Sequence, residues 1–213
     1  MLQAMRVSGA RVPEVLHQGG VLLCLEWLTE TTPNADAWQA LGVTLARLHG
    51  SDGAAYGWPE DYAFGPVVID NAARSDWPTF WAEARLACHL PHIPSAFARR
   101  IEALAVDLPN RLPRAPRGAL LHGDLWTGNA LFSGDTAFLI DPACYHGDAE
   151  VDLAMLDLFG APHARFWQGY GPVEPDRASR RAIYQLWPAL VHLRLFGAGY
   201  EPMVSGLLDV ANR

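Results

Sequence analysis

Two short stretches of the chain carry polar residues whose types and spacing suit phosphate chemistry. LLHGDLWTGNALF holds His122, Asp124 and Asn129 in a loop between apolar runs, and FLIDPA ends an apolar run with Asp141. A loop carboxylate such as Asp124 can accept the proton of a substrate hydroxyl. Oxygen atoms of Asn129 and Asp141 suit Mg²⁺, which takes its remaining ligands from water and substrate phosphates. A base, an amide and a strand-end carboxylate together predict phosphoryl transfer.

Each of these residues, taken alone, has an ordinary structural explanation. A single Asp in a turn is usually a cap, a single Asn usually forms a turn, and a His beside an apolar run is usually hydrogen-bonded at the edge of the core. The joint occurrence of HGD, an Asn five residues after the Asp, and a hairpin that ends in Asp is much harder to obtain by chance. The spacing therefore favours a catalytic loop.

The composition narrows the class of protein. The chain has 213 residues, a net charge of −7 and 50% hydrophobic residues, so it can bury a sizeable core. An acidic chain lacks the basic face of a nucleic-acid binder, and no apolar run approaches the roughly 18 residues of a membrane span. Cys24, Cys88 and Cys144 lack a CxxC spacing, which favours free thiols in a reducing compartment. We therefore expect a cytoplasmic protein without a nucleic-acid or membrane partner.

The apolar periodicity predicts a mainly helical chain. The strand VLLCLEWL (residues 21–28) is expected to be buried, and residues 51–76 are expected to form an irregular loop. A short hairpin is expected between Leu131 and Ile140. Helices are expected at residues 1–7, 35–50, 77–90, 95–107, 150–160, 162–170, 175–197 and 202–211. A few strands followed mostly by helices are typical of an α+β fold dominated by helix.

Longer motifs resemble those of the fructosamine kinases (ketosamine kinases). HGDLWTGN, IDPACYHGDAEVDLAM and LFG carry this resemblance, with an LExL segment and an LAxLH helix upstream. HGDLxxxN followed by ID is shared with the wider group of aminoglycoside- and choline-kinase-like phosphotransferases, which are relatives of protein kinases. Trp126, Gly128, the DPA that begins at Asp141, and the segment from Tyr145 to Asp148 belong to the narrower pattern. The likeness covers nearly the whole chain.

The resemblance implies a role for each matched residue of the catalytic loop. Asp124 would be the catalytic base, and His122 would brace the loop. Asn129 and Asp141 would bind the metal ion. Asp152, at the start of a following helix, would support the catalytic loop from below.

The resemblance also implies where ATP and the sugar bind. The backbone of Glu26, Trp27 and Leu28 would contact the adenine as a hinge between two lobes. Trp126 and the segment Tyr145–Asp148 would face the sugar, so that Trp126, Tyr145 and Asp148 become candidate substrate residues.

By the same resemblance, the chain would use ATP and Mg²⁺ to phosphorylate a sugar hydroxyl of a ketoamine (fructosamine or ribulosamine), free or linked to protein. The phosphorylated adduct would break down and release the amine, which is a deglycation repair role. Two alternatives stay open: a sibling kinase for an aminoglycoside or choline, and a non-catalytic binding module without the ATP clamp. A metal-dependent hydrolase is disfavoured, because it needs no Asn five residues after Asp124.

The chain departs from the kinase pattern in its first part. It contains no Lys, and no glycine-rich turn precedes the hinge, although kinases hold the ATP phosphates with both. We therefore expect a protein-kinase-like C-terminal lobe with most of the N-terminal lobe absent, through truncation, loss, or supply by another chain. Residues 1–28 would be an N-lobe helix end and hinge strand. Residues 29–213 would be the helical C-lobe, with catalytic loop 120–132 and metal-binding strand 137–141. The uncovered apolar face is expected to favour a homodimer.

Overall fold

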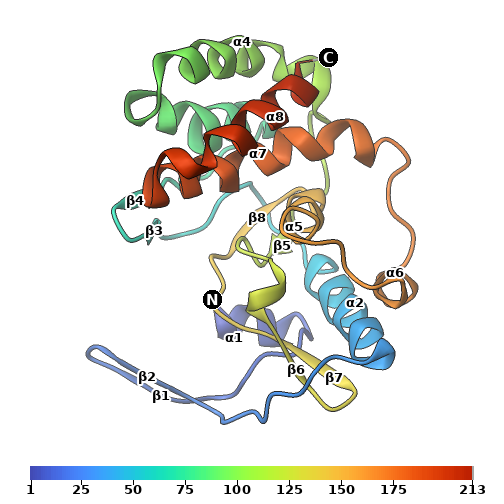
Figure 1. The fold of residues 1–213 in the computed structure, drawn as a ribbon. Helices are drawn as coiled ribbons and strands as arrows, with labels where there is room; N and C mark the ends of the chain where they lie inside the picture. Colours follow the sequence, from blue (N-terminus) through green and yellow to red (C-terminus); the bar gives the residue numbers. More distant parts are fainter. Residues whose placement is uncertain (213) are drawn as a thin grey trace.

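The structure, a computed structural model, describes residues 1–212 and is built mainly of helices (Figure 1). The helices are α1 (Leu2–Val7), α2 (Ala35–His49), α3 (Trp77–Phe80), α4 (Ser95–Arg111), α5 (Glu150–Leu156), α6 (Ala164–Tyr170), α7 (Arg177–Phe196) and α8 (Glu201–Ala211). The strands form antiparallel two-stranded sheets: β1 (Val15–Gly19) with β2 (Leu22–Leu25), β3 (Tyr62–Phe64) with β4 (Val67–Ile69), β5 (Ala119–Leu121) with β8 (Tyr145–Gly147), and β6 (Ala130–Ser133) with β7 (Thr136–Leu139). The predicted α+β class, dominated by helix, is confirmed.

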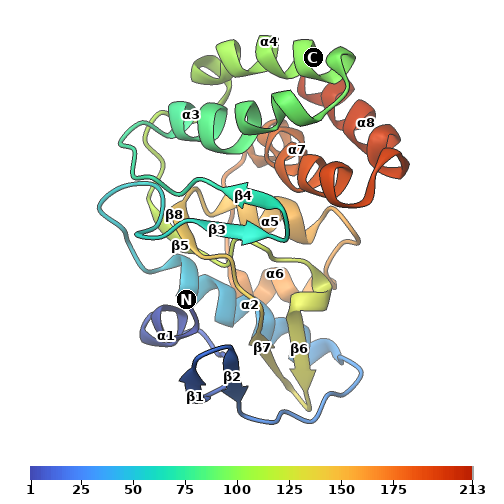
Figure 2. The same ribbon diagram turned by 90° about the vertical axis from the view of Figure 1, so that its left-hand side faces the viewer.

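The elements form an upper helical layer and a lower half. Helices α3, α4, α7 and α8 make the upper layer, while α1, α2, α6 and the hairpin β6–β7 make the lower half (Figures 1 and 2). The hairpin β3–β4 and the pair β5–β8 lie between them in both views. Strand β5 therefore lies at the boundary between the two halves.

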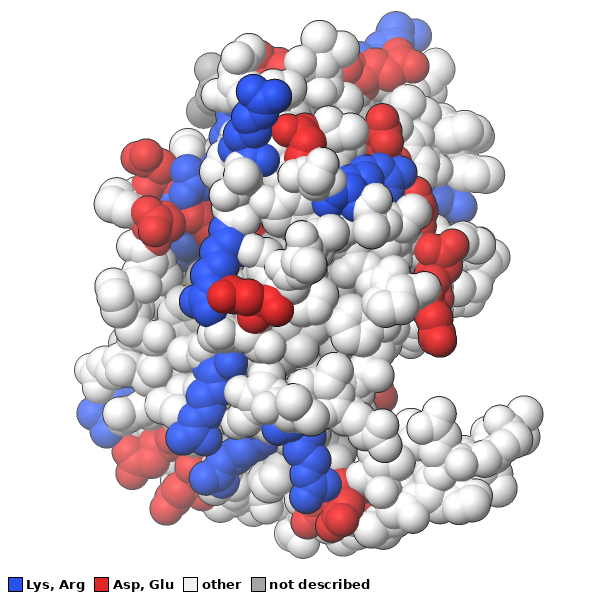
Figure 3. All heavy atoms as spheres, turned by 180° about the vertical axis from the view of Figure 1, so that it is seen from behind, with Lys and Arg blue, Asp and Glu red and all other residues white. Residues whose placement is uncertain are grey.

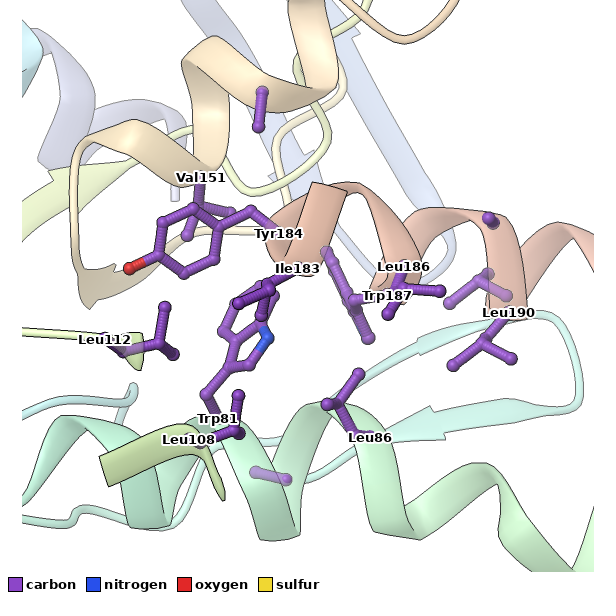
Figure 4. Close-up of a cluster of buried hydrophobic side chains, with 14 of the residues drawn as sticks. Trp81, Leu86, Leu108, Leu112, Val151, Ile183, Tyr184, Leu186, Trp187 and Leu190 are labelled. Carbon is purple, nitrogen blue, oxygen red and sulfur yellow. The ribbon is translucent and has the colours of Figure 1, made fainter. Parts of the chain in front are cut away.

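Two hydrophobic cores follow this division. The upper core contains Trp81, Tyr184 and Trp187, whose side chains meet between α7 and the helix that follows α3 (Figure 4). The lower core is built around α2 and the hairpin β6–β7. Strand β5 connects the cores, because Leu121 belongs to the upper core and Leu120 to the lower one. Successive strand residues point to opposite faces, so β5 is fixed from both sides where the predicted catalytic loop begins.

Helices α2 and α6 approach at backbone distance through glycines. A Cβ atom on Gly42 would lie 2.1 Å from the carbonyl oxygen of Phe166, and one on Gly169 would lie 2.0 Å from that of Gln39. Such distances cannot be relieved by side-chain rotation, because the obstacle in each case is backbone. The close approach lets the hydroxyl of Tyr170, at the end of α6, reach His49, at the end of α2, in the site described below.

Gly42→Ala is expected to lower the free energy of unfolding by about 1–3 kcal/mol, since overpacking outweighs the gain in helix propensity. Gly206→Ala is the matched control, because Gly206 also lies in a helix but a Cβ there meets nothing within 4 Å. The control should gain up to about 1 kcal/mol. Urea denaturation of both variants measures the difference, and equal effects would contradict the close approach.

Some predicted elements differ from the structure. The strand expected to be buried at residues 21–28 belongs to the hairpin β1–β2, which extends from the body of the molecule (Figure 1). The apolar content of residues 21–28 predicts burial, yet Val21 is fully exposed and Trp27 is 89% exposed. They are exposed because no other element of the described residues covers this segment. The expected loop at residues 51–76 contains the hairpin β3–β4, with Gly65 in its turn at φ +54°.

Other differences concern element ends. The predicted helix at residues 77–90 runs as α3, a π-helical turn (Trp81–Leu86) and a 3₁₀ turn (Ala87–His92). Strand β8 was not expected, and its three residues are too few to show an alternating pattern. The metal-binding strand predicted at 137–141 ends at Leu139, so Asp141 follows it.

The surface carries both signs of charge. On the face opposite to that of Figure 1, basic and acidic side chains are mixed (Figure 3). In the structure as a whole, charged side chains form ion pairs, for example Arg117 with Asp52 and Arg165 with Asp36. Within residues 1–212, none of the helices combines the length and the apolar character that crossing a bilayer would require.

Candidate active site

His122 joins the catalytic loop to the segment that carries Asp141. Its ring is fully buried, and Nε2 lies 2.8 Å from the carbonyl oxygen of Ile140. A carbonyl only accepts, so Nε2 carries the proton, and Nδ1 is then the acceptor for the N–H of Asp124 at 3.3 Å. Burial lowers the pKa of His122, which keeps the ring neutral. His122 thus holds the loop in place rather than exchanging protons.

Asp152, on α5, supports the catalytic loop from below. Its carboxylate accepts hydrogen bonds from the backbone N–H groups of His122 (2.7 Å) and Gly123 (3.0 Å). Its Oδ2 also lies 3.0 Å from Nε2 of His49, whose Nδ1 lies 2.8 Å from the hydroxyl of Tyr170. Burial by itself would raise the pKa of Asp152, but the hydrogen bonds from His49 and from the His122 backbone hold it below its ordinary value.

Gly123 gives the loop its sharp turn above this carboxylate. Its φ is +80°, and a Cβ atom there would lie 2.1 Å from the carbonyl oxygen of Ala143. A residue with a side chain could neither adopt this conformation readily nor fit the space. Gly123 therefore lets the backbone N–H groups of two consecutive residues point at Asp152.

Asp124 follows this turn with its side chain partly exposed. Its Oδ2 accepts a hydrogen bond from Nδ2 of Asn129 at 3.0 Å, and the same amide nitrogen donates to the Asp124 carbonyl at 2.8 Å. Burial raises the pKa of Asp124 to about 6, although the bond from Asn129 opposes the shift. A carboxylate with a pKa just below neutrality is largely ionised at pH 7 and remains basic enough to accept a proton.

Asn129 and Asp141 are the candidate metal ligands. Because Nδ2 of Asn129 is bonded to Asp124, its Oδ1 atom is left for another partner. The Ile140 N–H donates to the Asn129 carbonyl at 3.0 Å, which brings the two segments together. Asp141 is exposed and has φ +51°, an uncommon conformation for a residue other than glycine. Uncommon backbone conformations gather at functional sites.

These two residues fit a magnesium ion, because both offer oxygen atoms and Mg²⁺ commonly binds one or two carboxylates together with substrate phosphates. Among residues 1–212, no group of three or more His, Cys, Asp and Glu side chains is arranged to hold a metal ion. A magnesium ion held here would therefore take further ligands from a nucleotide and water.

A cavity of about 190 Å³ opens beside Asp124 and is called the apolar cavity below. Trp126, 41% exposed, lines it together with Phe64 and Met155. Helix α7 supplies the longest wall, with Trp187, Pro188, Val191, His192, Leu195 and Phe196. Most of this wall was not predicted from the sequence. The sequence signal for this wall is the spacing of its residues, which form pairs at 187–188, 191–192 and 195–196. Successive pairs are four residues apart, and this spacing places them along one side of a helix.

The structure does not bring Tyr145 and Asp148 to the apolar cavity. Tyr145 is buried, and the guanidinium of Arg85 lies 4.2 Å from its ring centre. The Asp148 carboxylate is also buried and accepts hydrogen bonds from the Tyr184 hydroxyl (2.7 Å) and the Glu150 N–H (3.0 Å). Burial raises the pKa of Asp148. Tyr145 therefore packs in the upper core, whereas Asp148 lines a separate cavity of about 500 Å³.

The predicted adenine-contacting residues lie in extended chain after β2. The N–H of Glu26 donates to the Glu14 carbonyl at 2.8 Å, and its carboxylate accepts from the Glu14 N–H at 3.1 Å. Trp27 is exposed and Leu28 is partly buried. Their contact with a nucleotide stays a prediction.

The fold and the loop geometry define a class of protein, the kinase-like phosphotransferases. A choline/ethanolamine kinase family protein from Mesorhizobium loti superimposes with a TM-score of 0.62 over 99% of this chain and 76% of that one, and its 17% identity shows the fold alone. A crystal structure from Thermobifida fusca, named "putative fructosamine-3-kinase", superimposes with a TM-score of 0.93 at 33% identity, over 100% of this chain and 78% of that one.

Sequence comparisons narrow the class to one family. Residues 1–211 match the family model described as fructosamine kinase. The chain is 38% identical to "Probable ketoamine kinase slr1563" of Synechocystis, over 97% of this chain and 75% of that protein. It is 35% identical to "Probable ketoamine kinase YniA" of Escherichia coli K12, over 96% of this chain and 75% of that protein. The chain belongs to the fructosamine kinase family and is an ATP-dependent phosphotransferase.

Proposed function

We propose that the chain phosphorylates a sugar hydroxyl of a ketoamine and so serves the removal of sugars from glycated amines. The observation that carries the proposal is the position of Asp124, whose carboxylate lies at a cavity, is oriented by Asn129 and has a pKa of about 6. The relatives are named probable ketoamine kinases, and these names support a ketoamine as the substrate of this chain.

In this proposal each residue of the loop has a separate task. Asp124 accepts the proton of the attacking hydroxyl, and the amide of Asn129 orients the carboxylate. Oδ1 of Asn129 and the carboxylate of Asp141 would hold Mg²⁺, which supplies positive charge to the phosphates when bound. Trp126 would face the sugar, and the backbone of residues 26–28 would contact the adenine.

The test uses the purified chain with ATP, Mg²⁺ and a deoxyfructosyl or deoxyribulosyl amine. Phosphorus NMR should show ADP and a new phosphate monoester appearing in equal amounts. Release of free phosphate from ATP while the ketoamine stays intact, with no sugar ester and no free amine formed, would contradict the proposal. Transfer of the phosphoryl group to choline or an aminoglycoside, and to no ketoamine, would show that the substrate is not a ketoamine.

Asp141→Ala is expected to weaken the binding of ATP in the presence of Mg²⁺ by about tenfold or more, because a metal bound by one or two carboxylates loses one. Asp135→Ala is the control, since Asp135 is an Asp in the turn of the same hairpin, where it bonds Asn34. Calorimetric titration with ATP, once in the presence of Mg²⁺ and once in the presence of EDTA, measures the affinity for ATP under both conditions. Equal affinities of the native chain under both conditions would remove Asp141 from the metal site.

A further inference from the structure

The apolar cavity offers few polar partners to a ligand. Among the described residues that line it, Asp124 supplies a carboxylate and His192 an imidazole. Nδ1 of His192 lies 2.8 Å from the Pro188 carbonyl and must donate to it, so that Nε2 is the nitrogen left for a ligand. Asp124 already accepts a bond from Asn129. The rest of the lining is aliphatic and aromatic, apart from the indole N–H groups.

Aromatic rings continue from this cavity over the adjoining surface. The ring centres of Trp126 and Phe159 are 6.3 Å apart, those of Phe159 and His192 5.1 Å, and those of His192 and Phe196 5.5 Å. Phe159 is 39% exposed and Phe196 is 65% exposed. Exposed aromatic rings grouped around a cavity are a common mark of a binding surface for an apolar group.

A ketoamine has two unlike ends. The sugar carries several hydroxyl groups, and each loses hydrogen bonds to water when it enters a cavity without partners. The substituent on the amine can be apolar, and it gains from the same burial. The sugar hydroxyl that reacts must reach Asp124, one of the residues that line the cavity, while the apolar wall that α7 supplies suits the other end of the molecule.

We infer that the α7 wall of the apolar cavity binds the amine substituent of the ketoamine, beside a sugar held at Asp124 and Trp126, and selects apolar or aromatic substituents over charged ones, an inference that rests on the proposed function. Phe196 and Val191, which line the cavity from α7, are the specificity-determining residues. An anionic substituent would be brought close to the Asp124 carboxylate and away from water, so it is disfavoured most. The secondary ammonium of the ketoamine is compatible with the carboxylate and the aromatic faces.

The experiment compares adducts that share the sugar and differ at the amine. The probes are deoxyfructosyl and deoxyribulosyl adducts of phenethylamine (aromatic), ethanolamine (polar) and taurine (anionic). Affinity is measured by calorimetry, and kcat/KM for phosphate transfer is measured with ATP and Mg²⁺. The phenethylamine adduct should bind about tenfold more tightly than the ethanolamine adduct, and the taurine adduct should bind most weakly.

The variant Phe196→Ala tests whether the preference for an aromatic substituent arises at the apolar cavity. Its side chain is largely exposed, so the variant keeps its fold, and thermal unfolding confirms this. It should lose about fivefold in affinity for the phenethylamine adduct and less than about twofold for the ethanolamine adduct. Val106→Ala, an exposed apolar residue on α4, is the control and should change neither.

The outcomes separate this inference from the proposed function. The expected ranking without any phosphate transfer would support the cavity assignment and contradict the proposed function. Transfer to all adducts with equal kcat/KM would support the proposed function and overturn the inference. Equal loss of both affinities in Phe196→Ala, or no binding of the phenethylamine adduct, would also overturn it.

Discussion

Asp124→Asn is expected to slow phosphate transfer by about 10²–10⁴-fold and to make the folded chain more stable at pH 8. The rate falls because the amide cannot accept the hydroxyl proton. The shape of the side chain is kept, so the loop built on Asp152 and His122 stays in place. A transfer rate equal to that of the native chain would show that Asp124 is not the base.

The gain in stability depends on pH in a direction that the pKa fixes. Burial raises the pKa of Asp124 from 3.8 to about 6, so the folded chain binds this proton more tightly than the unfolded chain does. The stabilisation is complete below pH 3.8 and is lost as the pH rises through about 6. Asn has no proton to lose. The variant should therefore match the native chain near pH 4 and exceed it by roughly 1–3 kcal/mol at pH 8.

Urea denaturation at pH 4 and pH 8 measures this difference, and Asp135→Asn is the control on an exposed turn. The transfer rate of the native chain should rise with pH around pH 6, because only the ionised carboxylate accepts a proton. A difference in stability that is the same at both pH values would contradict a raised pKa for Asp124.

The local structure of the loop at residues 120–132 was predictable, because the parts of the loop are close in sequence. HGD and an Asn five residues later leave room for one tight turn and a 3₁₀ turn (Thr127–Asn129), which carries the amide back to Asp124. The hairpin β6–β7 then returns the chain to the loop, where Ile140 bonds His122 and Asn129. Local spacing and a short hairpin thus define most of this geometry.

The apolar cavity was not predictable in the same way. Its wall on α7 lies some sixty residues after Asp124, and which face of that helix covers the loop depends on how α5 and α7 pack. The burial of the Tyr145 and Asp148 side chains was likewise not predictable from the sequence. A strand of three residues gives no alternation from which to read its buried face, so their burial depends on contacts with Arg85 and Tyr184.

The hairpin β1–β2 shows why apolar content alone does not predict burial. Leu22, Leu23 and Trp27 have the composition of a buried strand, yet they are more than half exposed. Burial requires a second surface, and a two-stranded hairpin cannot cover itself. The chain spans about three quarters of the length of the relatives it matches.

Asp152→Asn is expected to destabilise the fold by about 2–4 kcal/mol and to lower kcat by about 100-fold. The carboxylate accepts bonds from two backbone N–H groups, those of His122 and Gly123, and from His49. An amide of the same size keeps one acceptor oxygen, and its NH₂ group faces donors. At least one buried N–H then loses its partner, and the loop that carries Asp124 shifts.

If Asp152 positions the catalytic loop, its substitution should change kcat and not KM, whereas a general loss of stability would not separate the two. Asp152 is buried beneath the loop and lines no part of the apolar cavity, so KM for the ketoamine should change little while kcat falls. Hydrogen exchange should accelerate at the amides of His122 and Gly123. Asp36→Asn, at an exposed ion pair with Arg165, is the control and should cost less than about 1 kcal/mol.

The hydrogen bonds behind Asp152 allow a graded test of the same idea. Tyr170→Phe removes only the hydroxyl that contacts His49, whereas His49→Gln disturbs the bond to Asp152 itself. If Asp152 positions the catalytic loop, kcat should fall least in Tyr170→Phe, further in His49→Gln and most in Asp152→Asn. Loss of stability in all variants with an unchanged kcat would mean that Asp152 holds the fold together without setting the position of Asp124.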